Sequence, residues 1–207
     1  SATVRARGDF LNVIPLPFQN VNAFAGGGIV AVGDGHTPSG FSLAESVDIL
    51  GHEIAHLVID SHAGFTYKDE SGALNESLAD FFGMAVSNFN HPVMGADVDF
   101  PIRNYLHPDS EELSDPQPIR YSDTVDTRDD AGGVHINSGI LNRALALAMV
   151  GTIAARGNDE ALRARQSVLG LSSDILVPLV FKALGDVPFM QTTNLEQFAA
   201  NLSQYCR

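Results

Sequence analysis

The sequence predicts an α+β fold in which a small N-terminal β segment precedes a mainly helical part. The first forty residues carry short apolar runs broken by Gly and Pro, whereas apolar residues recur at helical spacing from Ser42 onward. The chain has 207 residues, 44% of them hydrophobic and 18% charged, which is enough apolar mass for one unit with a sizeable core. We expect residues 1–60, with the β segment and the first long helix, and residues 61–207, the helical lobe, to form that single unit.

The β segment is expected in two stretches. Residues 9–18 are apolar but include Pro15 and Pro17, a pattern typical of an edge strand or a loop. Residues 28–32 predict a second strand that ends at a turn. The three glycines at 26–28 resemble part of a nucleotide-binding loop, but no βαβ context follows them, so we reject that interpretation.

Helices are expected from residue 43 onward. Ser42 and Glu45 have the spacing of a capping box, and the apolar residues that follow predict a helix over residues 43–60. Later helices are expected over residues 75–89, over residues 137–153 and, two or three of them, after residue 159. Thr193 or Asn194 is the expected N-cap of the last one.

The chain is strongly acidic. Its 12 Lys and Arg against 25 Asp and Glu give a formal net charge of −13. Such a surface repels phosphate groups, so we expect neither nucleic acid nor a membrane as a partner, and cations suit the charge better. Residues 97–130 hold ten acidic residues against three arginines, together with four prolines. A solvated acidic loop and a cation-binding role are both open for this stretch.

A histidine pair with a glutamate between them lies inside the first predicted long helix. His52 and His56 are four residues apart and so share a helix face, which lets both imidazoles bind one metal ion. Glu53 follows the first histidine and is placed to act as a general base for a water molecule on that ion. The alternative is two helix histidines that make ordinary hydrogen bonds.

A catalytic zinc site needs a third protein ligand and an open fourth position. Glu76, twenty residues after His56 and on the second predicted long helix, is the candidate third ligand. Asp80 lies one helical turn further on the same face, where it is expected to accept a hydrogen bond from a ligand histidine. Acidic pairs at this spacing are also common on exposed helix faces.

A third element precedes the helix expected at residue 137. Gly132 and Gly133 stand just before His135, and a glycine pair there lets the backbone and the imidazole approach a ligand closely. The alternative is a loop whose histidine caps the helix.

These segments together resemble the thermolysin family of zinc metalloendopeptidases. The resemblance is carried by residues 52–56, 63–80 and 130–142, and residues 21–24 are similar to the family's substrate-binding edge strand. It implies the fold of a thermolysin-like zincin and the hydrolysis of internal peptide bonds. It also implies one catalytic zinc ion as the cofactor.

The resemblance implies a role for each site residue. His52, His56 and Glu76 would bind the zinc ion, and Glu53 would take a proton from the zinc-bound water. Tyr67 and His135 would stabilise the oxyanion of the tetrahedral intermediate, with Asp130 paired to the imidazole of His135. The implied substrate-binding residues are Asn22 and the backbone of Ala23 for the peptide main chain, Arg103 for a substrate carbonyl, and Leu43, Ile49 and Ile102 for a large hydrophobic side chain after the scissile bond.

Calcium is the cofactor for which the sequence departs from the family. Its members bind calcium through acidic residues near the ends of the second helix and in the following loop. Asp48 matches one such position, but Ser87 stands where the helix-end acid is usual, and residues 90–96 carry no carboxylate before Asp97. We expect the usual double calcium site to be lost or reduced, with one ion still possible at Asp97 and Asp99.

The length is the second departure, because 207 residues are too few for the family's usual two full lobes. We expect a compact member or a fragment of a longer precursor. The resemblance implies a secreted, monomeric enzyme with peptide or protein substrates and an inhibitory propeptide, although the first five residues do not resemble a signal peptide. Two alternatives stay open: an aminopeptidase on the same zinc framework, and a protease-derived zinc-containing binding or inhibitory module without hydrolytic activity.

Overall fold

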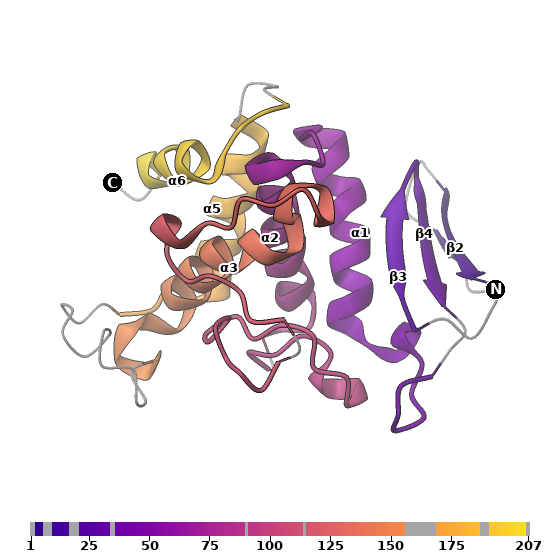
Figure 1. Ribbon diagram of the computed structural model, residues 1–207. Coiled ribbons are helices and arrows are strands. Elements are labelled where there is room, and N and C mark those ends of the chain that lie inside the picture. Colours follow the sequence, from indigo (N-terminus) through magenta and orange to yellow (C-terminus); the bar gives the residue numbers. More distant parts are fainter. Residues whose placement is uncertain are drawn as a thin grey trace.

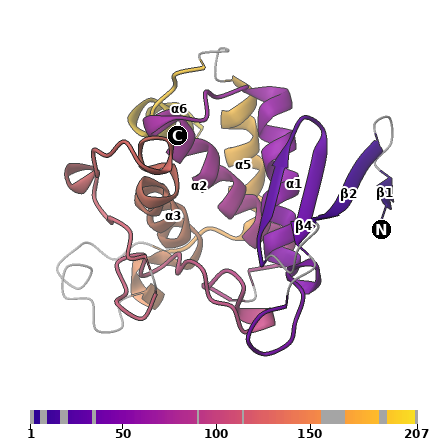
Figure 2. The same ribbon diagram turned by 45° about the vertical axis from the view of Figure 1, so that its right-hand side comes forward.

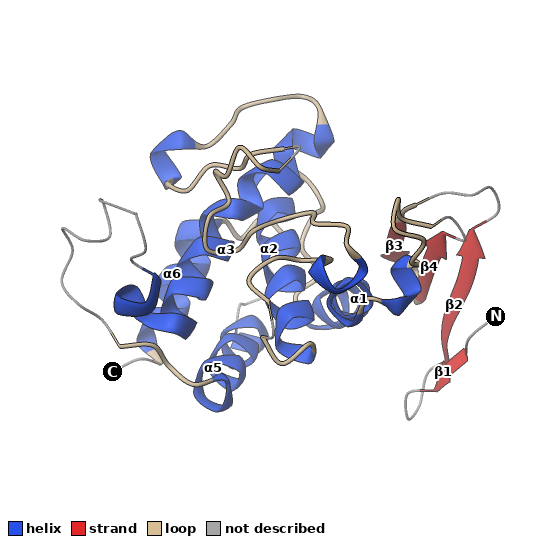
Figure 3. Cartoon of the chain, turned by 90° about the horizontal axis from the view of Figure 1, so that it is seen from below, coloured by secondary structure: helices blue, strands red, loops and turns tan. Residues whose placement is uncertain are grey.

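The computed structural model describes residues 3–5, 10–16, 21–33, 36–89, 91–113, 115–155, 169–186 and 191–205. Within them a small β sheet lies on one side of the first long helix, and the other helices lie on its opposite side (Figure 1). The view from below shows the same division (Figure 3). The predicted α+β class, with a small β segment ahead of a mainly helical part, is confirmed.

The sheet contains four strands in the order β1-β2-β4-β3. β1 (Thr3–Arg5) pairs antiparallel with β2 (Phe10–Leu16), and β2 runs parallel to β4 (Ile29–Gly33). β3 (Ala23–Gly26) pairs antiparallel with β4 and is an edge strand. Figure 2 shows the β3–β4 hairpin alongside helix α1, so this edge faces the helical part.

Residues 9–18 were predicted to form an edge strand or a loop, and the edge position was wrong. β2 lies between β1 and β4, although β1 pairs only with residues 10–12. Pro15 lies beyond that pairing, where β4 is the one described neighbour, so its missing N–H costs no bond to β1. The glycines at 27 and 28, with φ of 58° and 78°, form the turn of the β3–β4 hairpin.

Helix α1 (Val47–His62) begins later than predicted. The capping box of Ser42 and Glu45 is present, but it caps the short 3-10 helix η1 (Leu43–Glu45). Ser46 follows with extended backbone angles, φ −86° and ψ 118°, and breaks the helix before α1 starts. The apolar spacing alone does not reveal this break, because a 3-10 turn buries Leu43 as an α-helical turn would.

Helix α2 (Asp69–Val86) packs against α1 at a close glycine contact. A Cβ atom at Gly51 would lie 3.0 Å from Cα of Gly83, and a Cβ atom at Gly83 would lie 2.5 Å from the carbonyl oxygen of Asp48. Only glycine permits this approach, and it brings the inner faces of the two helices together. α2 starts six residues before the predicted residue 75, and residues 71–74 of these additional turns are buried although Ser71 and Gly72 carry no apolar side chain.

Helix α3 (Asp130–Ala155) lies on the other side of α2. Residues 131–133 have positive φ, so the regular helix begins at Val134, three residues before the predicted start. Between α2 and α3 the described residues form only two short 3-10 helices, η2 (Ala96–Val98) and η3 (Tyr121–Asp123).

The C-terminal part contains helices α5 (Ser173–Asp186) and α6 (Leu195–Gln204). Asn194 is the N-cap of α6, as predicted, and its side chain accepts a hydrogen bond from the N–H of Gln197 at 2.9 Å. Residues 156–168, where a further helix was also possible, lie outside the described residues, as do residue 9 and residues 17–18 of the first predicted strand. No helix among the described residues is long and apolar enough to cross a membrane.

Candidate functional site

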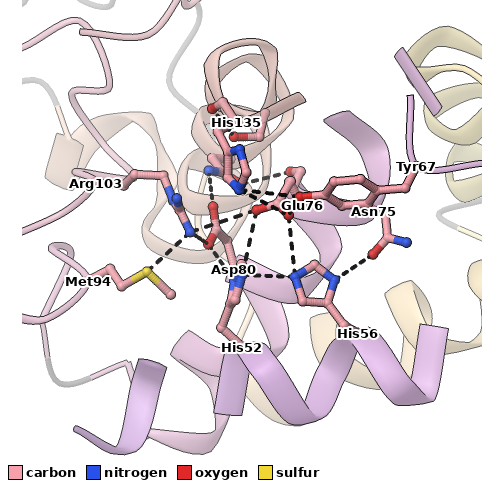
Figure 4. Close-up of polar contacts among 12 residues, drawn as sticks. His52, His56, Tyr67, Asn75, Glu76, Asp80, Met94, Arg103 and His135 are labelled. Carbon is pink, nitrogen blue, oxygen red and sulfur yellow. Dashed lines mark hydrogen bonds and ion pairs between the residues drawn. The ribbon is translucent and has the colours of Figure 1, made fainter. Parts of the chain in front are cut away.

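Three buried side chains from two helices form a cluster of potential metal ligands. His52 and His56 project from α1, and Glu76 projects from α2 toward them (Figure 4). The Nε2 atoms of the two histidines are 3.0 Å apart. Oε2 of Glu76 lies 3.5 Å from His52 Nε2, and Oε1 lies 3.4 Å from His56 Nε2. Among the described residues, this is the only group of three such side chains whose ligand atoms come this close.

The geometry and chemistry of this cluster fit a zinc ion. A tetrahedral zinc ion with bonds of about 2.0–2.1 Å holds its ligand atoms about 3.3 Å apart, close to the separations between these three side chains. Oε2 of Glu76 is buried without a hydrogen-bond partner among the described residues, an arrangement that costs free energy unless a cation compensates it. Two imidazoles and one carboxylate are also the ligand set of many catalytic zinc sites.

The second ring nitrogen of each histidine is engaged by a residue of α2. His56 Nδ1 lies 2.7 Å from Oδ1 of Asn75, and His52 Nδ1 lies 2.8 Å from Oδ1 of Asp80. The contact to Asp80 has ion-pair distance but lacks the alignment of a hydrogen bond. Both contacts orient the Nε2 atoms toward Glu76. Asn75 was not predicted from the sequence, although its position beside Glu76, on a helix facing the histidines, could have indicated it.

The charges of the cluster are strongly coupled. Burial by itself would lower the pKa of His56, but the contact with Glu76 and its negative charge raise that pKa to about 9. Burial by itself would raise the pKa of Glu76, but His56 and His52 hold it well below its ordinary value. The metal-free cluster therefore contains a buried carboxylate and a protonated imidazole at neutral pH, so a metal ion must displace a proton.

Glu53 lies on α1 beside the first ligand and lines the same cavity as the cluster. Its side chain is buried, and this burial raises its pKa despite the nearby histidines. A carboxylate with a raised pKa next to a metal site is suited to accept a proton from water.

Tyr67 and His135 come from segments outside α1 and meet beside Glu76 (Figure 4). The Tyr67 hydroxyl donates to Oε1 of Glu76 and lies 3.3 Å from Nε2 of His135. Burial and the charge of Glu76 raise the pKa of Tyr67, which keeps its proton available for donation. Asp130 holds His135 twice, with Oδ1 2.5 Å from the ring Nδ1 and Oδ2 accepting from the backbone N–H at 2.8 Å.

Arg103 reaches the site from the loop between α2 and α3 and forms an ion pair with Asp80. Its Nη2 donates to Oδ1 of Asp80 at 2.6 Å and lies 4.0 Å from Oε2 of Glu76. The other carboxylate oxygen of Asp80 accepts from Nδ2 of Asn142, on α3, at 2.7 Å. Burial alone would raise the pKa of Asp80, but Arg103 and His52 lower it. This ion pair was not predicted from the sequence, since no local spacing links a loop arginine to a helix aspartate.

The edge strand β3 lies along the cavity that contains the cluster. Asn22, Ala23 and Phe24 line this cavity of about 390 Å³. The carbonyl of Asn22 accepts from the N–H of Gly33 at 2.7 Å, and because polar groups alternate along a strand, those of Ala23 point away from β4. The Asn22 side chain accepts from the N–H of Ala23 at 2.9 Å.

An adjoining cavity of about 260 Å³ is lined mostly by apolar side chains. It includes Leu43, Ile49 and Ile102, the three residues expected to form a hydrophobic pocket. Met94 and Phe100, which were not predicted from the sequence, line it as well. Both lie on the same loop as Ile102. A loop has no periodic apolar pattern, so the sequence does not show which of its residues face the cavity.

The acidic residues near the expected calcium positions bond to protein groups. The hydroxyl of Ser46 contacts a carboxylate oxygen of Asp48 and lies 2.7 Å from Oδ1 of Asp97. Asp99 accepts from a serine hydroxyl of another segment. The hydroxyl of Ser87 donates to a carbonyl of its own helix at 2.8 Å.

Comparison with known proteins finds metallopeptidase relatives for most of this chain. Residues 63–207 match the family model described as "Thermolysin metallopeptidase, alpha-helical domain". An extracellular metalloprotease of Pectobacterium carotovorum is 37% identical over 148 residues, 62% of this chain and 43% of that protein. A gelatinase of Enterococcus faecalis is 39% identical over 131 residues, 59% of this chain and 26% of that protein.

A solved structure is similar over nearly the whole chain. The precursor of protealysin, a metalloproteinase from Serratia proteamaculans, matches with a TM-score of 0.70 and 30% identity, covering 91% of this chain and 59% of that one. The chain spans less than half the length of the curated relatives it matches. Its match to the family model nevertheless covers well over half of its residues. This chain belongs to the thermolysin metallopeptidase family.

Proposed function

We propose that this chain is a zinc-dependent endopeptidase that hydrolyses internal peptide bonds. One observation carries the proposal: Glu53, Tyr67 and His135 surround the same three-ligand cluster, at a cavity bounded by the open edge of β3. A purely structural metal site needs neither a buried proton acceptor nor two half-exposed donors beside its ligands.

His52, His56 and Glu76 are the proposed ligands. When bound, the zinc ion would polarise a carbonyl and lower the pKa of a water molecule at its open position. Glu53 accepts the proton of the attacking water and passes it to the leaving amine. Tyr67 and His135 donate hydrogen bonds to the oxygen that becomes negative as the carbonyl is attacked. This route requires no covalent bond between substrate and protein.

The peptide is proposed to bind as an additional strand on β3. The outward-facing backbone of Ala23, together with the side chain of Asn22, would bind its main chain. The apolar cavity beside Glu53 favours a large hydrophobic residue after the scissile bond. Arg103, which lines that cavity and is held by Asp80, is placed to donate to a substrate carbonyl.

The context in the cell is proposed from the relatives. One of them is described as extracellular and another as the precursor of a metalloproteinase. We therefore propose that this protein acts outside the cell and that an inhibitory propeptide accompanies its synthesis.

Substitution of the proposed general base tests the function. Glu53→Gln is expected to retain one zinc ion per chain while peptide hydrolysis falls about a thousandfold, because the amide cannot accept the proton. Glu112→Gln, an exposed loop glutamate, is the matched control and should behave as the wild type. Wild-type rates on casein in Glu53→Gln would contradict the proposed mechanism.

The same assay separates the alternatives. A binding or inhibitory module would show no chelator-sensitive hydrolysis in the wild type. An aminopeptidase would release residues only from free amino termini, whereas an endopeptidase cleaves peptides whose amino terminus is acetylated. Mapping of cleavage sites in a mixed peptide library distinguishes these outcomes directly.

A further inference from the structure

Gln117 bonds to the backbone of His135 at a different group from Asp130. Its Nε2 donates to the carbonyl oxygen of His135 at 2.5 Å and lies 3.1 Å from the hydroxyl of Ser138, which itself donates to the same carbonyl at 2.7 Å. His135 is therefore held at its ring and N–H by Asp130 and at its carbonyl by Gln117.

The segment that carries Gln117 is fixed closely against α3. The backbone N–H of Gln117 donates to the carbonyl of Pro108 at 2.8 Å. A Cβ atom at Gly139 would lie 2.5 Å from Cβ of Gln117 and 3.0 Å from the carbonyl oxygen of Pro118. The absence of a side chain at Gly139 lets the segment lie flat on the helix, so the amide of Gln117 reaches the first turn.

Ordinary hydrogen-bond needs do not explain this amide. A carbonyl in the first turn of a helix already accepts from the N–H four residues later. The side chain of Gln117 is 5% exposed, and its Oε1 has no hydrogen-bond partner among the described residues. Burial of an amide oxygen without a hydrogen-bond partner costs free energy of folding, so the position of Gln117 needs an explanation other than stability.

The turn before His135 explains why the amide of Gln117 is buried there. Asp130, Ala131, Gly132 and Gly133 all have positive φ, from 51° to 95°, so no regular helix lies behind His135. Backbone bonds from Gly132 and Gly133 to the carbonyl of Asp129 close this turn, and the side-chain contacts of Asp130 and Gln117 add to them at His135 itself. The ring Nε2 of His135 lies 3.3 Å from the Tyr67 hydroxyl, so the two donors are placed to share one oxygen, and small displacements of catalytic groups are costly.

We propose that Gln117 is a positioning residue for His135, an inference that rests on the proposed function of His135 as an oxyanion donor. Gln117 also lines a cavity of about 410 Å³ with His135 and Ile136, yet it acts through His135, by fixing the first turn of α3.

The test replaces the amide without changing its length. Gln117→Met keeps an unbranched side chain against Gly139 but removes the donor. The matched control is Asn201→Leu, since Asn201 on α6 likewise donates its amide to a helix carbonyl, that of Ala183 at 3.0 Å, away from the site. We expect Gln117→Met to keep its zinc and to lower kcat about tenfold with KM within twofold, while Asn201→Leu keeps wild-type kcat.

A second measurement does not depend on hydrolysis. In the metal-free chain, the NMR signals of the His135 ring and backbone N–H should shift in Gln117→Met and stay in place in Asn201→Leu. Unmoved His135 signals in Gln117→Met, or a kcat loss no larger than that of Asn201→Leu, would overturn the proposal. If the wild type hydrolyses no peptide, the proposed function fails, and the signals of His135 still decide whether Gln117 positions it.

Discussion

The metal-ligand cluster and the pair of proposed oxyanion donors are built in different ways. His52, His56 and Glu76 project from the middle of two regular helices that meet at a glycine contact. Tyr67 precedes α2, and His135 follows a turn with positive φ. The ligands therefore take their positions from regular helical geometry, whereas the donors take theirs from a few individual loop and turn contacts.

This difference has a consequence for what each substitution should do. Helical spacing is robust, so a change at a ligand should remove the metal and leave the helices in place. Loop and turn positions depend on a few contacts, so a change at a donor should lower the rate and leave the metal bound.

The largest effect is expected for His56→Ala. Loss of one of three ligands should abolish stoichiometric zinc binding after dialysis and lower hydrolysis by about a thousandfold or more. The control is His62→Ala on the same helix, where the exposed ring contacts Phe181, and it should retain both properties. Zinc analysis together with circular dichroism checks the outcome, and loss of helix content in His56→Ala would contradict the independence of fold and metal.

Tyr67→Phe should keep the zinc and lose rate. Removal of one donor to a developing oxyanion is expected to lower kcat about a hundredfold, with little change in KM. Tyr121→Phe is the control, because Tyr121 is an exposed tyrosine bonded to Glu70. Steady-state kinetics on an acetylated peptide decide it, and an unchanged kcat in Tyr67→Phe would exclude the donor role.

Gly83→Ala tests the helix contact that assembles the ligands. The added Cβ would lie 2.5 Å from the carbonyl of Asp48 and 2.8 Å from the backbone nitrogen of His52, which should lower the free energy of unfolding by about 2–3 kcal/mol. Gly185→Ala in α5, where nothing lies within 4 Å, should be neutral or slightly stabilising. Urea unfolding measures both, and equal stabilities would show that the contact is looser than described.

Zinc affinity should depend on pH. Because the pKa of His56 is raised to about 9, zinc must displace a proton below that pH, and apparent affinity should rise about tenfold per pH unit from pH 7 toward 9. The imidazolium–Glu76 pair stabilises the metal-free fold below the ordinary histidine pKa, and this contribution is lost as pH rises through about 9. Chelator competition measures the affinity, and a flat profile between pH 7 and 9 would contradict the ion pair.

Calcium should have the smallest effect. Asp48 and Asp97 are already linked through the Ser46 hydroxyl, so millimolar calcium should shift the Tm of the zinc-loaded protein only slightly. Two tight sites in a calcium titration would overturn the expectation that the double site is lost or reduced.

The sequence allowed the ligand cluster to be anticipated because its spacing is local. Two histidines four positions apart, and a polar pair one turn apart on the next helix, lie on one face by helical geometry alone. Other features could not be predicted in this way. The helix break at Ser46 leaves the apolar spacing unchanged. No local pattern connects Arg103 with Asp80, or Gln117 with His135. Such contacts follow from tertiary packing, which periodicity cannot supply.

Zinc titration of the metal-free protein tests the central claim most directly. Metal is removed with a chelator, zinc is added back in known amounts, and cleavage of an acetylated peptide is followed. One equivalent of zinc per chain should restore full hydrolysis. Hydrolysis that survives metal removal, or one bound equivalent that restores none, would contradict a zinc endopeptidase built on His52, His56 and Glu76.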